Sequence, residues 1–161
     1  MTQVAQVGNE NPIIPMLKLL SERNKMLRQK SSPVEQFDDE LKNTIASILV
    51  WCEGKQLVGI SAPELGIPKR IIVVWEKALK VVLVNPVVVK MKGEHRVREG
   101  CFNLPGKQYW VTRPKIVKVR YQTMDGEQKS LKGHNLTAQI LMHETDHLDG
   151  VLIDQIGKET E

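Results

Sequence analysis

The chain has 161 residues, of which 41% are hydrophobic, which fits one domain with a buried core, and nothing in the sequence suggests a second. The net charge of +4 arises from interleaved basic and acidic residues, and only 4% of residues are aromatic, so a dedicated nucleic-acid-binding surface is disfavoured. The sequence also lacks the features of a signal peptide, an apolar run long enough to span a membrane, and a disulfide framework. We expect one soluble, cytoplasmic domain over residues 1–161, with residues 1–12 as a flexible arm.

The first clear element is a helix that begins after Asp38. Residues 15–30 carry loosely spaced apolar positions and are compatible with a short helix or an extended segment. Asp38 can cap a helix, and Gly54 is a suitable stop. Between them, an apolar stripe recurs at helical spacing: Leu41, Ile45, Ile48, Leu49 and Cys52. Cys52 is therefore interpreted as a small core residue.

The middle of the chain changes to a β pattern. Residues 58–62, 70–76 and 80–91 are short runs rich in valine and isoleucine, separated by proline and glycine. A hairpin is predicted between residues 116–121 and 128–131, and residues 151–154 are expected to return as a strand. Helices do not alternate with strands, so the pattern predicts an α+β fold in which antiparallel β-sheets pack around a central helix.

That central helix carries the strongest chemical signal, His143-Glu144-Thr145-Asp146-His147. Two histidines four residues apart point from one face of a helix and can bind the same metal ion. Glu144 lies beside that face, where its carboxylate can take a proton from water. Asp149-Gly150 marks the helix end. The pattern favours a hydrolytic metal centre over its alternative, a surface helix with two histidines.

A third ligand is expected upstream, because only a short tail follows His147. The candidates are Cys52, His95, Cys101 and His134. Cys52 belongs to the core stripe, His95 falls in an expected exposed turn, and His134 stands two to three turns before His143. Cys101 is preferred, because Gly100 before it and Pro105-Gly106 after it suit a bent segment that presents a thiolate to a metal.

Three stretches of the chain resemble the peptide deformylase family. Residues 143–147 match its His-Glu-x-x-His helix, including the aspartate before the second histidine. Glu99-Gly100-Cys101 matches its Glu-Gly-Cys loop, and residues 58–66 are similar to its glycine-containing active-site strand. Order and spacing agree over roughly residues 12–156.

This resemblance implies hydrolysis of the N-formyl group from the N-terminal methionine of nascent polypeptides. One divalent metal ion would be held by Cys101, His143 and His147, with Fe²⁺ in the cell and Zn²⁺ or Ni²⁺ also accepted. The implied partner is an N-formyl-methionyl peptide, with transient proximity to the ribosome. No specific nucleic acid and no membrane are expected as partners.

The resemblance also assigns catalytic and substrate-binding residues. Glu144 would act as general base, and the backbone N–H of Phe102 would donate to the oxyanion. Val58, Gly59, Gly100 and Phe102 would line the substrate site. Asp146, which points off the metal face, is expected to pair with Arg113 and to hold the helix in place.

Position 64 departs from the family pattern. The family has a glutamine there, whose amide donates a second hydrogen bond to the oxyanion, whereas this chain has Glu64. An ionised carboxylate cannot donate and repels a developing oxyanion, although a protonated one can donate. Two alternatives to an active deformylase therefore stand: a divergent metal-binding homologue with weak or altered activity, and an unrelated metallopeptidase.

Overall fold

The computed structural model describes residues 16–161, and the arm predicted at residues 1–12 lies outside them. The helical elements are η1 (Lys25–Arg28), α1 (Asp39–Cys52), η2 (Ala62–Leu65), α2 (Leu136–Leu148) and α3 (Ile153–Ile156), η denoting a 3₁₀ helix. The strands are β1 (Gly59–Ser61), β2 (Ile71–Trp75), β3 (Lys80–Lys92), β4 (His95–Cys101), β5 (Leu104–Arg113), β6 (Ile116–Gln122), β7 (Gln128–His134) and β8 (Lys158–Glu159).

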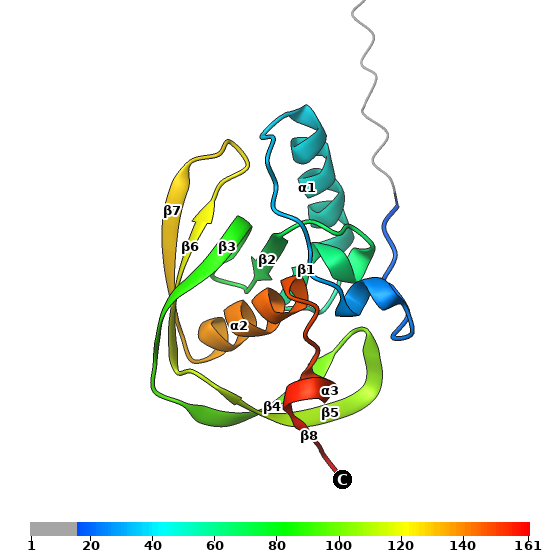
Figure 1. Ribbon diagram of the computed structural model, residues 1–161, viewed down its shortest axis with the longest axis vertical. Coiled ribbons are helices and arrows are strands. Elements are labelled where there is room, and N and C mark those ends of the chain that lie inside the picture. Colours follow the sequence, from blue (N-terminus) through cyan, green and yellow to red (C-terminus); the bar gives the residue numbers. More distant parts are fainter. Residues whose placement is uncertain (1–15) are drawn as a thin grey trace, which may run out of the picture.

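The strands form two antiparallel sheets beside helix α2. A five-stranded sheet has the order β1-β2-β3-β6-β7, and a three-stranded sheet has the order β4-β5-β8. Figure 1 shows α2 lying against the curved larger sheet, with the β4–β5 hairpin on its other side. The predicted α+β class, with antiparallel sheets around a central helix, is confirmed.

At β2 the larger sheet is covered on both faces, which explains the continuous apolar run of this strand. Successive residues of a strand point to opposite faces. Ile71 and Val73 belong to the apolar cluster that contains α1, whereas Ile72 and Val74 belong to the cluster that contains α2. The sheet therefore supports α2 from one side while α1 closes its opposite face.

Both predicted helices form, and their ends have local causes. The Asp38 side chain accepts a hydrogen bond from the backbone N–H of Leu41 at 3.0 Å, as expected of a cap. Helix α2 ends at Leu148, and Gly150 follows with φ of 72°. A Cβ on Gly150 would lie 2.5 Å from the carbonyl carbon of Arg28. Glycine is thus required there by both the left-handed backbone and the close approach of η1.

Two sequence predictions differ from the structure. Residues 151–154 were expected as a strand, but Ile153–Ile156 is a short helix, with the Leu152 N–H bonded to the Gln155 side chain at 2.7 Å. Leu152 and Ile153 are apolar because they pack against β5, not because they join a sheet. His95, expected in an exposed turn, is instead the partly buried first residue of β4, opposite Arg113. The turn lies just before it, at Gly93 and Glu94.

No helix among residues 16–161 is long and apolar enough to cross a membrane.

Candidate functional site

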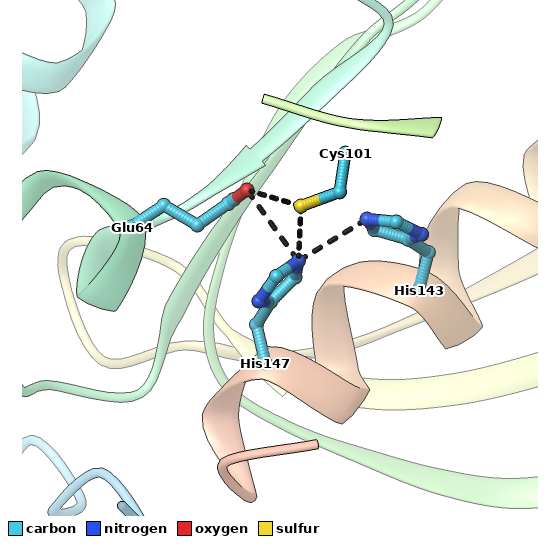
Figure 2. Close-up of side chains that lie close together, drawn as sticks. All are labelled: Glu64, Cys101, His143 and His147. Atoms are coloured by element: carbon cyan, nitrogen blue, oxygen red, sulfur yellow. Dashed lines mark hydrogen bonds and ion pairs between the residues drawn. The ribbon is translucent and has the colours of Figure 1, made fainter. Parts of the chain in front are cut away.

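The two histidines of α2 converge on one point (Figure 2). Their Nε2 atoms are 3.1 Å apart, one helical turn from each other. His147 is 2% exposed, and burial lowers its pKa to about 4, so its imidazole is neutral at pH 7. Two ring nitrogens that face each other at this distance suit a shared cation, because imidazole nitrogens are common metal ligands.

Cys101 joins the histidines from the end of β4. Its Sγ lies 3.5 Å from the Nε2 of His147. Cys101 is the last residue of β4, at the head of the β4–β5 hairpin, and Figure 2 shows its thiol directed at the histidines of α2. Burial, followed by the charge of Glu64, raises the pKa of the Cys101 thiol far above its ordinary value. The thiol therefore keeps its proton until a metal ion displaces it.

Glu64 reaches the same point from η2. Its Oε2 accepts hydrogen bonds from the backbone N–H of Ser61 at 2.7 Å and from the Ser61 hydroxyl at 2.9 Å. Burial alone would raise the pKa of Glu64, but the neighbouring histidines and the Ser61 N–H favour the carboxylate, so the pKa lies below its ordinary value. One ligand atom each from Glu64, Cys101, His143 and His147 lies within 4.8 Å of every other, a spacing that suits one metal ion.

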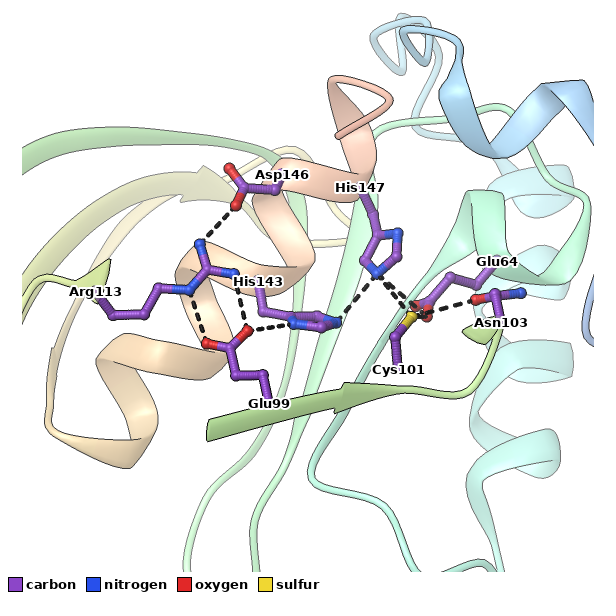
Figure 3. A network of polar contacts seen from close by, with 8 residues as sticks. All are labelled: Glu64, Glu99, Cys101, Asn103, Arg113, His143, Asp146 and His147. Atoms are coloured by element: carbon purple, nitrogen blue, oxygen red, sulfur yellow. Dashed lines mark hydrogen bonds and ion pairs between the residues drawn. The ribbon is translucent and has the colours of Figure 1, made fainter. Parts of the chain in front are cut away.

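A second network orients His143 (Figure 3). Its Nδ1 lies 2.8 Å from Glu99, whose carboxylate also takes two hydrogen bonds from Arg113 at 2.8 and 2.9 Å. Burial alone would raise the pKa of Glu99, but the bonds from Arg113 and His143 hold it at about 2. An ionised Glu99 can only accept, so Nδ1 of His143 donates to it, and Nε2 is the ring nitrogen that faces the metal site.

Arg113 continues this network to Asp146 at 2.6 Å, which confirms the predicted pair. Arg113 is 3% exposed and lies between two carboxylates, so removing it leaves Glu99 buried without its main partner. We expect Arg113→Met to lower the unfolding free energy by about 3–5 kcal/mol. Urea unfolding of the metal-free protein measures this change.

The matched control is Lys42→Met, which breaks an exposed pair with Asp125. That change should alter the unfolding free energy by about 1 kcal/mol or less. Similar, small losses in the two variants would show that the buried network does not stabilise the fold.

Glu144 is buried beside the ligand cluster, at 5% exposure. Burial, reinforced by the negative charge of Glu64, raises the pKa of Glu144 well above its ordinary value. Its Oε2 has no hydrogen-bond partner among residues 16–161. A buried carboxyl group with a free oxygen and a raised pKa is suited to exchange protons with a bound reactant.

A cleft of about 1090 Å³ opens onto these side chains. It is lined by Glu64, Cys101, His143 and Glu144, together with the residues expected to bind substrate: Val58, Gly59, Gly100 and Phe102. Phe102 follows Cys101 in the β4–β5 turn, and its 44% exposed ring stands edge-on to Trp51. The structure thus brings every predicted site residue to the lining of one cleft except His147, which is buried and joins the ligand cluster through its Nε2.

Gly59 is fixed by the close approach of β1 to α2. A Cβ there would lie 2.7 Å from Cγ2 of Ile140, 3.2 Å from the carbonyl oxygen of Val73 and 3.3 Å from Cγ of Glu144. We expect Gly59→Ala to lower the unfolding free energy by about 1–3 kcal/mol, because the added methyl overpacks this contact. Urea unfolding again provides the measurement.

Gly100→Ala is the control for this glycine, since its Cβ would meet only the carbonyl oxygen of Lys107 at 3.7 Å. It should leave the unfolding free energy nearly unchanged. An equally stable Gly59→Ala protein would mean that β1 and α2 have room to separate.

Sequence reasoning missed the link from Glu99 to His143. A signal was available, because Glu99 and Cys101 are two residues apart on one strand and therefore share a face. Once Cys101 is placed toward α2, Glu99 points the same way. The metal-ligand candidates set aside stay apart from the cluster: Cys52 is a buried core thiol, as predicted, and His134 is exposed at the end of β7.

Comparison with known proteins agrees with this geometry. The family model for polypeptide deformylase matches residues 16–161. The peptide deformylase of Dictyoglomus thermophilum is 37% identical over 139 residues, covering 84% of this chain and 89% of the relative. That of Bartonella tribocorum is 36% identical over 154 residues, covering 90% and 86%. The crystal structure of peptide deformylase from Thermotoga maritima matches with a TM-score of 0.84 at 31% identity, covering 88% of this chain and 97% of that one. The chain therefore belongs to the peptide deformylase family, the metal-dependent hydrolases that remove the N-formyl group from nascent peptides.

Proposed function

We propose that Cys101, His143 and His147 hold the single metal ion of this deformylase. The observation that carries the proposal is the convergence of one sulfur and two nitrogens beside the cleft, with spacings of 3.5 and 3.1 Å. In a tetrahedral zinc site, a sulfur and a nitrogen lie about 3.5 Å apart and two nitrogens about 3.3 Å. The donor set thus fits a divalent ion, and thiolate with imidazole also suits Fe²⁺, the proposed ion in the cell.

The remaining side chains would carry the reaction. When bound, the ion supplies Lewis-acid activation of water and of the formyl carbonyl. Glu144 accepts the proton of the attacking water and passes it to the leaving amine. The backbone N–H of Phe102 donates to the oxyanion, and Glu64 stands where the family has a second donor.

The cleft would hold the formyl-methionyl end of the peptide. Val58 and Gly59 lead into the β1 edge on one side, and Gly100 and Phe102 form the other side. Leu136 and Ile140 of α2 add apolar surface, which suits a methionine side chain. Since the substrate is a nascent chain, we place the protein in the cytoplasm near the ribosome. We also propose that it is a single catalytic domain, which the family match over residues 16–161 supports.

Removing ligands tests the metal site. Cys101→Ser should weaken metal binding, because a hydroxyl is a poorer ligand than a thiolate, and His143→Ala should abolish it. The measurement is the metal content per protein after dialysis against zinc-free buffer. Cys52→Ala, which alters the other cysteine in the core, should keep full stoichiometry. Full metal content in the Cys101 or His143 variant would rule out the assignment.

A further inference from the structure

The position of Glu64 suggests more than a replaced oxyanion donor. Its Oε1 is 3.4 Å from Nε2 of His147 and 3.7 Å from Sγ of Cys101 (Figure 2). Around a tetrahedral zinc ion, an oxygen ligand lies about 3.4 Å from a nitrogen and about 3.6 Å from a sulfur. Oε1 therefore stands where a fourth ligand would stand, about as close to Cys101 and His147 as the proposed ligands are to one another.

The rest of the side chain is fixed in a way that aims this oxygen at the site. Glu64 is 1% exposed, and Ser61 engages Oε2 with both its backbone N–H and its hydroxyl. With Oε2 held by donors, Oε1 is left facing Cys101 and His147. A carboxylate anchored through one oxygen, with its other oxygen directed at two proposed ligands, is arranged for binding a metal through a single oxygen.

Charge balance favours the same arrangement. A divalent ion bound by one thiolate and two neutral imidazoles leaves one positive charge in a buried site. The Glu64 carboxylate cancels that charge, and buried charges are stable only when they are paired or coordinated. With a glutamine at this position, no ligand in the cluster besides the thiolate would carry a negative charge, and Glu144 would be the carboxyl group left beside it.

We propose that Glu64 is a fourth protein ligand of the metal ion, which closes the resting centre until this carboxylate moves aside for water and substrate. This inference rests on the proposed metal site. Four protein ligands are typical of closed structural sites, whereas catalytic sites keep one position open. Glu64 would thus act as a built-in gate on the deformylation centre, and Ser61 would hold the gate in place.

Crystallography of the full chain loaded with zinc tests this directly. We expect Glu64 Oε1 at about 2.0–2.2 Å from the zinc ion. In Glu64→Gln, a water should take the fourth position. A wild-type structure in which that water is already present and Oε1 is farther than about 3 Å, beyond any Zn–O bond, overturns the proposal.

Zinc affinity, measured by competition with a chromogenic chelator, gives a second readout in solution. Glu64→Gln should weaken zinc binding by about 100-fold or more, beyond the usual range for residues that only contact ligands. Glu144→Gln is the matched control, because it removes a neighbouring buried carboxylate that is outside the ligand cluster. Its loss of affinity should be smaller, and an equal or larger loss than that of Glu64→Gln contradicts the proposal.

Cys101→Ala separates this inference from the proposed function. If that variant binds zinc as tightly as wild type, Cys101 is not a ligand and the metal site itself is misassigned. If its zinc affinity falls while Glu64 of the wild type stays away from the ion, the metal site stands and only the gate is wrong.

Discussion

Glu144→Gln should reduce kcat on formyl-methionyl peptides by about 10²- to 10⁴-fold, the usual contribution of a positioned general base. The amide keeps the size of the side chain but cannot accept the proton of the attacking water. Glu144 lines the cleft next to His143, and its Oε2 has no partner among residues 16–161 that would hold it away from a reactant. Because Glu144 is not among the proposed ligands, the variant should still bind one metal ion.

The measurement is kcat with nickel-loaded protein, alongside metal content and urea unfolding. Asp149→Asn serves as a control, since it neutralises an exposed carboxylate at the end of the same helix. It should leave kcat unchanged. A Glu144→Gln protein that remains fully active would remove Glu144 from the proton transfer, whereas a loss of metal would move its role to metal binding.

The sequence predicted the helices and strands whose signals lie within one short segment of the chain. Helix α1 has its cap in Asp38 and its apolar stripe within one short segment, so the sequence alone locates it. The same holds for His143 and His147, because helical geometry places residues four apart on one face. Strand β2 was recognisable because both faces of the sheet are covered at this strand, which requires apolar residues throughout it.

The β4–β5 hairpin was not predicted, for a physical reason. Arg96, Arg98 and Trp110 all lie on exposed positions of these strands, so few apolar residues mark the pairing. The cation–π contact of Arg96 with Trp110 and the Arg113–Glu99 pair take the place of an apolar pattern. Contacts of these two kinds, between residues far apart in the sequence, produce no periodic pattern of apolar residues, although they position Cys101.

The distances around Glu64 were also beyond the reach of sequence. The departure from glutamine was visible, but the orientation of the carboxyl group depends on Ser61 and on the approach of η2 to the Cys101 turn. A motif fixes which residue stands at a position. It does not fix which of two carboxylate oxygens faces the metal site.

Glu64→Gln is expected to raise kcat/KM on formyl-methionyl peptides. The amide oxygen can accept the two Ser61 hydrogen bonds now made to Oε2, which leaves the NH₂ group facing Cys101 and His147. That group becomes a donor to the developing oxyanion in place of a negative charge that repels it. Removal of one such donor typically lowers kcat by about 10²- to 10³-fold, and this sets the upper limit of the gain.

The gain should appear mainly in kcat, because the new hydrogen bond strengthens as the oxyanion develops and adds little to substrate binding. Steady-state kinetics of wild type and variant, each with its metal content measured, provide the test. Glu53→Gln, which neutralises an exposed carboxylate at the end of α1, controls for the loss of one negative charge. If Glu64→Gln and wild type have equal kcat/KM at equal metal content, Glu64 neither faces the oxyanion nor blocks the ion. If Glu64→Gln only lowers KM and leaves kcat unchanged, Glu64 repels the substrate before the reaction and does not affect the transition state.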